Sequence, residues 1–277
     1  MNTSSRINRI DSCFAGLESQ RRKALVPFVT AGDPSLEALV PVLHALVRGG
    51  ADVLEIGVPF SDPMADGPVI QRSSERALER GVTSRHVFAA VREFRTHDDA
   101  TPVVLMGYLN PLEARGAETY AREAAEAGVD GLLLVDLPPE EADENRAILA
   151  AQGLHLIPLV APTTSPERLA IAGRQARGYV YYVSFAGVTG AHDRLQAGDA
   201  MRHCREVKAA TTVPVLIGFG IRDAASARSV AAAADGVVIG SALVEALAGA
   251  NDPADAAARA EAFLAPIRAA LDLVGGA

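Results

Sequence analysis

Short apolar runs alternate along the chain with longer segments in which apolar residues recur every three or four positions. A short run bounded by turn residues is typical of a buried strand, and the longer pattern is typical of an amphipathic helix. The alternation therefore predicts a series of strands, each followed by a helix. Strands are expected at residues 24–29, 53–56, 102–106, 132–135, 154–160, 179–183, 213–217 and 236–239.

Helical periodicity follows each of these runs. Helices are expected at residues 36–47, 69–79, 118–127, from 138 onward, from 166 to about 175, 199–209, 224–233 and 243–247, with an additional helix at 253–273. One more helix precedes the first strand, because Ile7, Ile10, Phe14 and Leu17 form a single apolar stripe. We expect that helix, over residues 6–18, to cap one end of the fold.

Eight strand–helix units imply parallel strands joined by right-handed crossovers. For a chain of 277 residues the closed solution is a (β/α)8 TIM barrel of the α/β class, here with an N-terminal capping helix and an extra helix after strand 8. Three units also begin alike, with Asp52, Asp130 or Asp235 just before the strand. We expect one barrel domain over residues 1–277. A doubly wound open sheet is the alternative, and the absence of G-x-G-x-x-G after the first strand argues against it.

Charge and cysteine content narrow the possible functions. Lys plus Arg number 26 and Asp plus Glu number 34, which gives a net charge of −8. A chain of this charge without basic runs is not expected to bind nucleic acid, so an anionic ligand needs a local site. Cys13 and Cys204 lack metal-ligand spacing and are expected to be free thiols in a reducing cytoplasm. We expect no signal peptide, no membrane span, no metal and no dinucleotide cofactor.

The most informative stretch begins with the second strand, residues 53–56. Val53 and Glu55 share one face of that strand, which puts a carboxylate among apolar side chains at its end. The following loop, residues 57–68, is stiffened by three prolines and carries Asp62 and Asp66. These aspartates could simply bond their own backbone. We favour Glu55 and Asp66 as a general acid/base pair at the mouth of the barrel, because active sites lie at the C-terminal ends of barrel strands.

Glycine clusters follow each of the last three strands. They are residues 187–190 (Gly-Val-Thr-Gly), 218–220 (Gly-Phe-Gly) and 240–241 (Gly-Ser). Exposed backbone N–H groups in such loops bind phosphate without a lysine, and TIM barrels often bind phosphate there. The three loops together predict a phosphate site.

Other polar side chains are weaker candidates. His192 could approach a ligand from the loop after strand 6. Tyr181 shares a strand face with Val183 and is expected to point inward. Asp136 ends strand 4 and could either cap a helix or support the site.

With these residues assembled, the chain resembles the tryptophan synthase alpha chain family over nearly its full length. The most specific stretches are residues 27–34, 54–72, 128–139, 181–190, 218–221 and 235–243. The resemblance implies cleavage of indole-3-glycerol phosphate to indole and glyceraldehyde 3-phosphate without a cofactor. It implies that Glu55 protonates the indole ring carbon and accepts the proton of the side-chain hydroxyl, and that Asp66 holds the ring N–H.

The resemblance also implies further site residues and a partner, the tryptophan synthase beta chain in an alpha2beta2 complex. Substrate contacts fall on Phe28, Tyr181, Thr189, Gly190, Gly220, Gly240 and Ser241, and beta-chain contacts on Asp62, Pro63, Asn110 and Pro138. Phe185 departs from the family, in which many members carry a basic or small polar residue at that position.

Two other functions remain open from the sequence. One is a stand-alone lyase that releases indole without a beta chain. The other is a catalytically weak chain kept as a regulatory binding partner, which the presence of Glu55, Asp66 and the glycine loops argues against.

Overall fold

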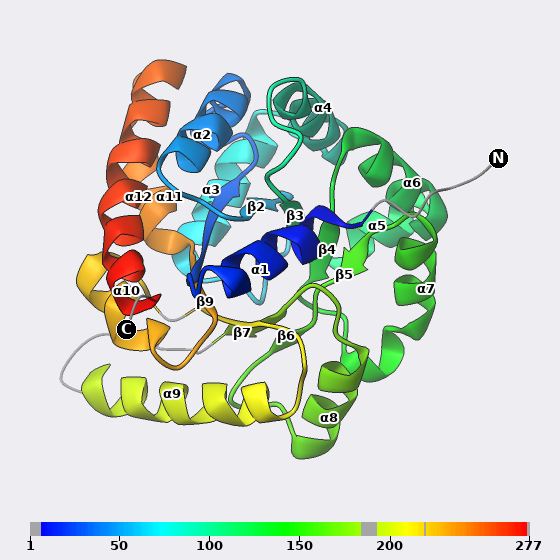
Figure 1. Ribbon diagram of the computed structural model, residues 1–277. Coiled ribbons are helices and arrows are strands. Elements are labelled where there is room, and N and C mark those ends of the chain that lie inside the picture. The colour runs from blue at the N-terminus through cyan, green and yellow to red at the C-terminus, as the bar shows by residue number, and fades with distance from the viewer. Residues whose placement is uncertain (1–6, 184–192, 219, 276–277) are drawn as a thin grey trace.

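The structure is a computed structural model that describes residues 7–183, 193–218 and 220–275. Its described part contains nine parallel strands in one sheet, in the order β5-β4-β3-β2-β1-β9-β8-β7-β6 (Figure 1). Their bounds are β1 (Ala24–Thr30), β2 (Leu54–Gly57), β3 (Val103–Gly107), β4 (Gly131–Leu134), β5 (His155–Leu156), β6 (Leu159–Val160), β7 (Val180–Val183), β8 (Val215–Gly218) and β9 (Gly236–Ile239).

The two end strands of this sheet close it into a barrel. β5 pairs with β4 at one end of the strand order, and β6 pairs with β7 at the other end. Only residues 157–158 separate β5 from β6 in the sequence. The N–H of Ile157 donates to Leu132 O at 2.8 Å, and Pro158 O accepts from Tyr181 N–H at 3.0 Å. β5 and β6 are therefore the halves of the one strand predicted over residues 154–160, interrupted where Pro158 has no N–H to donate. The predicted (β/α)8 barrel is confirmed, and the doubly wound alternative is wrong.

Helices surround the strands (Figure 1). They are α1 (Arg9–Ser19), α2 (Leu36–Arg48), α3 (Pro68–Glu79), α4 (Ser84–Arg95), α5 (Leu109–Arg115), α6 (Ala117–Ala127), the 3-10 turn η1 (Pro139–Glu141), α7 (Asp143–Ala151), α8 (Pro166–Gln175), α9 (Asp193–Ala209), α10 (Ala224–Ala231), α11 (Ser241–Leu247) and α12 (Pro253–Gly275). Among the described residues, no helix is both long and apolar enough to cross a membrane.

Two of the observed helices are not predicted from the sequence, and a third begins earlier than predicted. α4 buries Val87, Val91 and Phe94 at helical spacing and packs between α2 and α6, so the second unit has two helices instead of one. α5 is a short helix that begins directly after β3. α9 begins at Asp193, earlier than the predicted start at residue 199.

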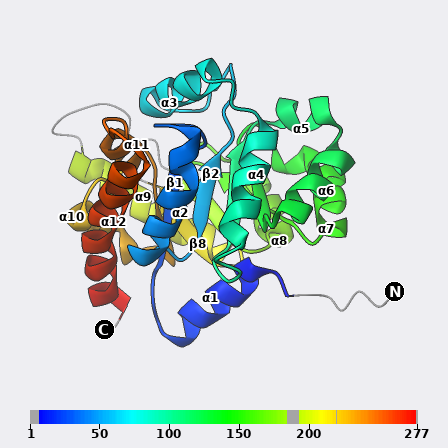
Figure 2. The same cartoon turned by 90° about the horizontal axis from the view of Figure 1, so that it is seen from above.

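α1 closes the end of the barrel opposite α3 (Figure 2). Its buried residues Ile10, Phe14 and Leu17 belong to the apolar cluster inside the barrel, which also contains Val53 and Tyr179. The rings of Phe14 and Tyr179 lie 5.6 Å apart. The predicted capping role of the N-terminal helix is therefore correct, and buried apolar side chains fill the interior at this end.

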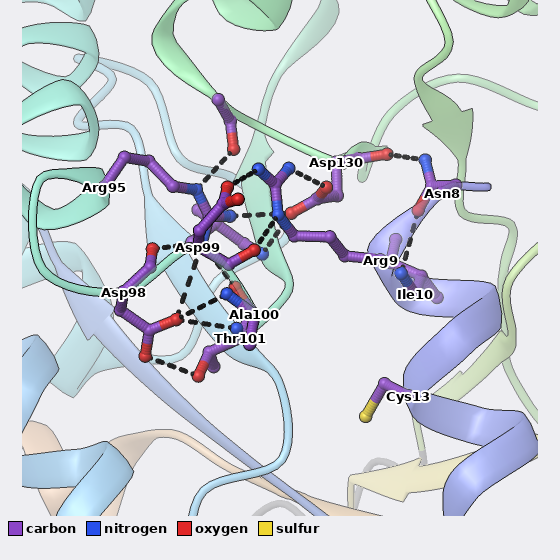
Figure 3. A network of polar contacts seen from close by, with 12 residues as sticks. Asn8, Arg9, Ile10, Cys13, Arg95, Asp98, Asp99, Ala100, Thr101 and Asp130 are labelled. Atoms are coloured by element: carbon purple, nitrogen blue, oxygen red, sulfur yellow. Dashed lines mark hydrogen bonds and ion pairs between the residues drawn. The ribbon is translucent and has the colours of Figure 1, made fainter. Parts of the chain in front are cut away.

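The aspartates that recur before strands join the strands at this basal end. Each accepts a backbone hydrogen bond of 2.8 to 2.9 Å from the neighbouring strand: Leu25 to Asp52, Val103 to Asp130 and Val215 to Asp235. Each is also paired with a cation. Asp130, for example, binds Arg9 at 2.9 Å and Arg95 at 2.8 Å (Figure 3). Because Arg9 opens α1, this ion-pair network fastens α1 to the barrel.

Candidate active site

Glu55 lies inside the barrel on β2, in register with Phe28 on β1 and Val104 on β3. Its exposed fraction is 1%, and neither carboxylate oxygen has a hydrogen-bond partner within the described chain. Burial, with a smaller contribution from the charge of Asp66, raises the pKa of Glu55 to about 8. A carboxyl group with such a pKa is largely protonated near neutral pH and can both give and take a proton.

Asp66 is presented by the loop between β2 and α3. The hydroxyl of Tyr108 donates to Asp66 Oδ2 at 3.1 Å, and the side-chain amide of Gln71 donates to Asp66 O at 2.9 Å. Burial raises the pKa of Asp66, and the bond from Tyr108 opposes that shift. The Asp66 carboxylate thus bonds a side chain from β3's end, not its own backbone. Asp62 is different, because its carboxylate accepts from its neighbour Ser61 at 2.6 Å.

The far end of this loop is fixed by α3, which begins with a proline at its first turn. The buried hydroxyls of Thr30 and Ser73 lie 2.6 Å apart and join β1 to α3. The guanidinium of Arg76 donates to both oxygens of Asp33, at 2.8 and 2.7 Å. The loop that carries Asp66 is therefore held at both ends by the barrel.

Glu55 and Asp66 share a cavity of about 400 Å³ at the C-terminal ends of the strands. Its wall is mostly apolar, formed by Phe28, Ile70, Met106, Val135, Leu159, Val183, Ile221 and Val238. Such a cavity suits an apolar ring, and the two carboxylates are the groups that could exchange protons with it. Among the described residues, no cluster of three side chains could ligate a metal ion.

Two glycines give the aromatic walls their positions. A Cβ on Gly57 would lie 2.5 Å from the Phe28 ring, and a Cβ on Gly218 would lie 2.4 Å from the Tyr181 hydroxyl. Tyr181 lines the cavity as predicted. Burial and the charges of Glu55 and Asp66 raise its pKa, so its phenol stays neutral.

Three of the residues predicted to bind phosphate lie just after β8 and β9. Gly220, Gly240 and Ser241 all line the cavity. Gly220 has φ +47°, and nothing lies within 4 Å of where a Cβ would be. The N–H groups of residues 243 and 244 bond to Gly240 O, so those of Ser241 and Ala242 precede the first hydrogen-bonded turn of α11. Thr189, Gly190, Phe185 and His192 lie outside the described residues.

Some neighbours of the site could not be found from the sequence. Tyr108 and Gln71 reach Asp66 only through the fold, and Arg222 lines the cavity beside Gly220. Asp136 is not part of the cavity wall. Its Oδ1 accepts from the N–H of Leu109 at 2.8 Å, so it caps the start of α5.

The residues predicted to touch a beta chain gather on one side of the barrel mouth. Asp62 and Pro63 follow β2, Asn110 lies in α5 after β3, and Pro138 follows β4. β2, β3 and β4 are consecutive neighbours in the sheet. Asp62 and Asn110 are exposed, and Pro63 and Pro138 are half-buried.

Comparison with known proteins agrees with this geometry. The family model described as tryptophan synthase alpha chain matches residues 14–272. The tryptophan synthase alpha chain of Xylella fastidiosa strain M12 is 65% identical over 268 residues, which cover 97% of this chain and 100% of the relative. That of Xanthomonas axonopodis pv. citri is 63% identical over 266 residues, or 96% and 99% of the two chains.

Solved structures are similar throughout. The tryptophan synthase subunit alpha of Legionella pneumophila superposes with a TM-score of 0.89 at 44% identity, over 97% of this chain and 100% of that one. A chain of the tryptophan synthase a2b2 complex of Pyrococcus furiosus gives a TM-score of 0.80 at 36% identity, over 89% and 98%. The family model, the relatives and the solved structures each match nearly the whole sequence. The chain therefore belongs to the tryptophan synthase alpha chain family.

Proposed function

We propose that Glu55 and Asp66 carry the alpha reaction of tryptophan synthase in this chain. The family's reaction is that of a lyase in tryptophan biosynthesis, the retro-aldol cleavage of indole-3-glycerol phosphate to indole and glyceraldehyde 3-phosphate. The observation that carries the residue assignment is that Glu55, buried and without a hydrogen-bond partner within the described chain, lines the same mostly apolar cavity as Asp66. The experiment that tests the function is the release of indole by the purified chain when it is given indole-3-glycerol phosphate.

In the proposed mechanism Glu55 acts twice. Its carboxylic acid first protonates the ring carbon that bears the side chain, and positive charge develops on the ring nitrogen. The Asp66 carboxylate accepts a hydrogen bond from the ring N–H and stabilises that charge. Glu55, now ionised, takes the proton of the side-chain hydroxyl. The carbonyl forms, the carbon–carbon bond breaks, its electrons return to the ring as indole, and Glu55 is again protonated.

The same proposal places the phosphate against Gly220, Gly240 and Ser241, with Thr189 and Gly190 as expected further contacts. Phe28 and Tyr181 would flank the indole. With the phosphate bound by the glycine loops and the indole between Phe28 and Tyr181, the reacting ring carbon would lie near Glu55. General acid catalysis requires this positioning.

A Gly240→Val variant is expected to bind glycerol phosphates at least about tenfold more weakly. A Cβ at this position would lie 3.7 Å from Phe28, which is ordinary van der Waals contact, and circular dichroism of the variant checks that it is folded. The added methyls would occupy the space in front of the N–H groups. The measurement is a calorimetric titration with glycerol 3-phosphate. Unchanged affinity in a folded variant would move the phosphate site elsewhere.

We propose that this chain binds a tryptophan synthase beta chain in an alpha2beta2 complex, through Asp62, Pro63, Asn110 and Pro138. The loop that presents Asp62 also carries Asp66. A partner that prefers the ordered loop therefore favours the active arrangement. The two free thiols Cys13 and Cys204 accord with a cytoplasmic location.

The isolated chain is expected to be a slow monomeric lyase whose turnover rises when a cognate beta chain is added. Asp62→Ala should weaken that activation and leave cleavage by the isolated chain unchanged. The measurement is indole release at saturating substrate, with and without beta chain. Asp199→Ala, an exposed change on α9, is the control and should be activated normally. A fast isolated chain that does not respond to the beta chain would favour a stand-alone lyase.

A further inference from the structure

Arg222 is a cation in the wall of the active-site cavity. It lies beside Gly220, Gly240 and Ser241, and its side chain is exposed. Its backbone N–H donates to Ser226 at 3.1 Å, but its guanidinium forms no ion pair or hydrogen bond with the residues that the structure describes. The adjacent carboxylate of Asp223 is occupied, because it accepts from the N–H and the hydroxyl of Ser226 at 2.8 and 2.7 Å.

Glu245 lies on the same wall, one helical turn after Ser241 on α11, and it too is exposed. Side chains of a helix lean toward its N-terminus, so the Glu245 carboxylate is directed toward the first turn of α11. Within the described chain it has no ion-pair partner. A cation and a carboxylate, neither of them in an ion pair within the described chain, therefore both line this cavity.

We propose that Arg222 binds the phosphate group of the substrate and that Glu245 weakens this binding, so that the pair sets the affinity of the cavity for phosphate esters. The inference rests on the proposed function, which places the phosphate at this end. Backbone N–H groups supply neutral hydrogen bonds, whereas a guanidinium supplies charge and a planar pair of donors that fits a phosphate. In a chain with a net charge of −8 the overall field repels a dianion, so a local positive charge favours its binding.

The test compares three variants of the full chain by titration with glycerol 3-phosphate. Arg222→Gln should weaken binding about tenfold, because a charge-assisted hydrogen bond is lost. Glu245→Gln should tighten it about two- to threefold, because a nearby like charge is removed. Arg228→Gln makes the same charge change at an exposed position of α10 outside the cavity, and it should bind like the wild type.

Kinetics provide a second readout. Arg222→Gln should raise KM for indole-3-glycerol phosphate and leave kcat unchanged, because the phosphate contact is equal in the ground and transition states. Arg222→Lys should restore part of the affinity. Arg222→Gln affinity within twofold of the wild type would overturn the assignment. A wild-type chain that neither binds glycerol 3-phosphate nor releases indole would instead overturn the proposed function.

Discussion

A Glu55→Gln variant is expected to fold normally and to bind glycerol 3-phosphate normally. It is expected to release indole more slowly, by about 10²- to 10⁴-fold, the usual loss when a general acid or base is removed. Glutamine has nearly the shape of glutamate, and neither carboxylate oxygen of Glu55 has a hydrogen bond to lose within the described structure. An amide cannot give a proton to the ring carbon or take one from the hydroxyl. Because both steps are assigned to one residue, the loss should lie at or beyond the upper end of that range.

The measurement is steady-state indole formation at saturating substrate. Glu113→Gln is the matched control, because Glu113 is an exposed carboxylate on α5 outside the cavity, and its turnover should equal that of the wild type. Near-normal turnover of folded Glu55→Gln protein would remove Glu55 from the mechanism.

The same variant changes how stability depends on pH. The pKa of Glu55 is raised from its ordinary value of 4.5 to about 8 in the folded chain. Between these values the unfolded chain is ionised at this position and the folded chain holds a proton, so the free energy of unfolding of the wild type falls as pH rises through the window. Glu55→Gln lacks this contribution. Its stability relative to the wild type, measured by denaturant unfolding, should rise from pH 4.5 to pH 8 and then level off.

Asp66→Asn is expected to lower the rate of cleavage by about 10²- to 10³-fold, since the charge that faces the developing cation is lost. The amide oxygen can still accept from the Tyr108 hydroxyl and from a ring N–H, so the loop and the bound substrate should keep their places. What the amide cannot supply is the negative charge that stabilises the protonated ring.

Single-turnover cleavage at saturating substrate is the appropriate measurement, because it separates chemistry from affinity. Asp199→Asn on α9 is the control, since Asp199 is an exposed carboxylate whose ion pair with Arg202 contributes little. A loss in Asp66→Asn that is confined to affinity would show that Asp66 is a binding residue only.

Much of the fold could be predicted because burial imposes period two on strands and a period of three to four residues on helices. The placement of Val53 and Glu55 on one inward face follows from strand parity and is what the structure has. The sequence predicts one strand over residues 154–160, which is apolar apart from His155, and does not reveal that its pairing is interrupted at Pro158, which has no N–H to donate. α4 was missed although its apolar spacing is helical, since the polar segment after α3 resembles a long loop.

The candidate site likewise contains some residues that the sequence predicts and others that it does not. Glu55 could be singled out because it is a carboxylate within an apolar strand, and Asp66 and the glycine clusters because they occur in loops that follow strands. The contact of Tyr108 with Asp66 joins residues 42 positions apart, and no periodicity predicts it. Arg222 was missed because one exposed arginine at the start of a helix resembles any solvated side chain. Only the closed barrel brings it to the wall of the same cavity as Ser241.

The packing of α1 against the base of the barrel affects the environment of Glu55 at the other end. Phe14 packs on Tyr179, and the pKa of the Tyr179 phenol is raised by burial and, to a smaller extent, by the charge of the nearby Glu55. Apolar side chains fill the interior between α1 and Glu55, and burial is the main reason that the pKa of Glu55 is raised above 4.5. The basal helix thus works as a seal against solvent. The acid strength of Glu55 therefore depends in part on side chains at the base of the barrel, such as Phe14 and Tyr179, which do not line the active-site cavity.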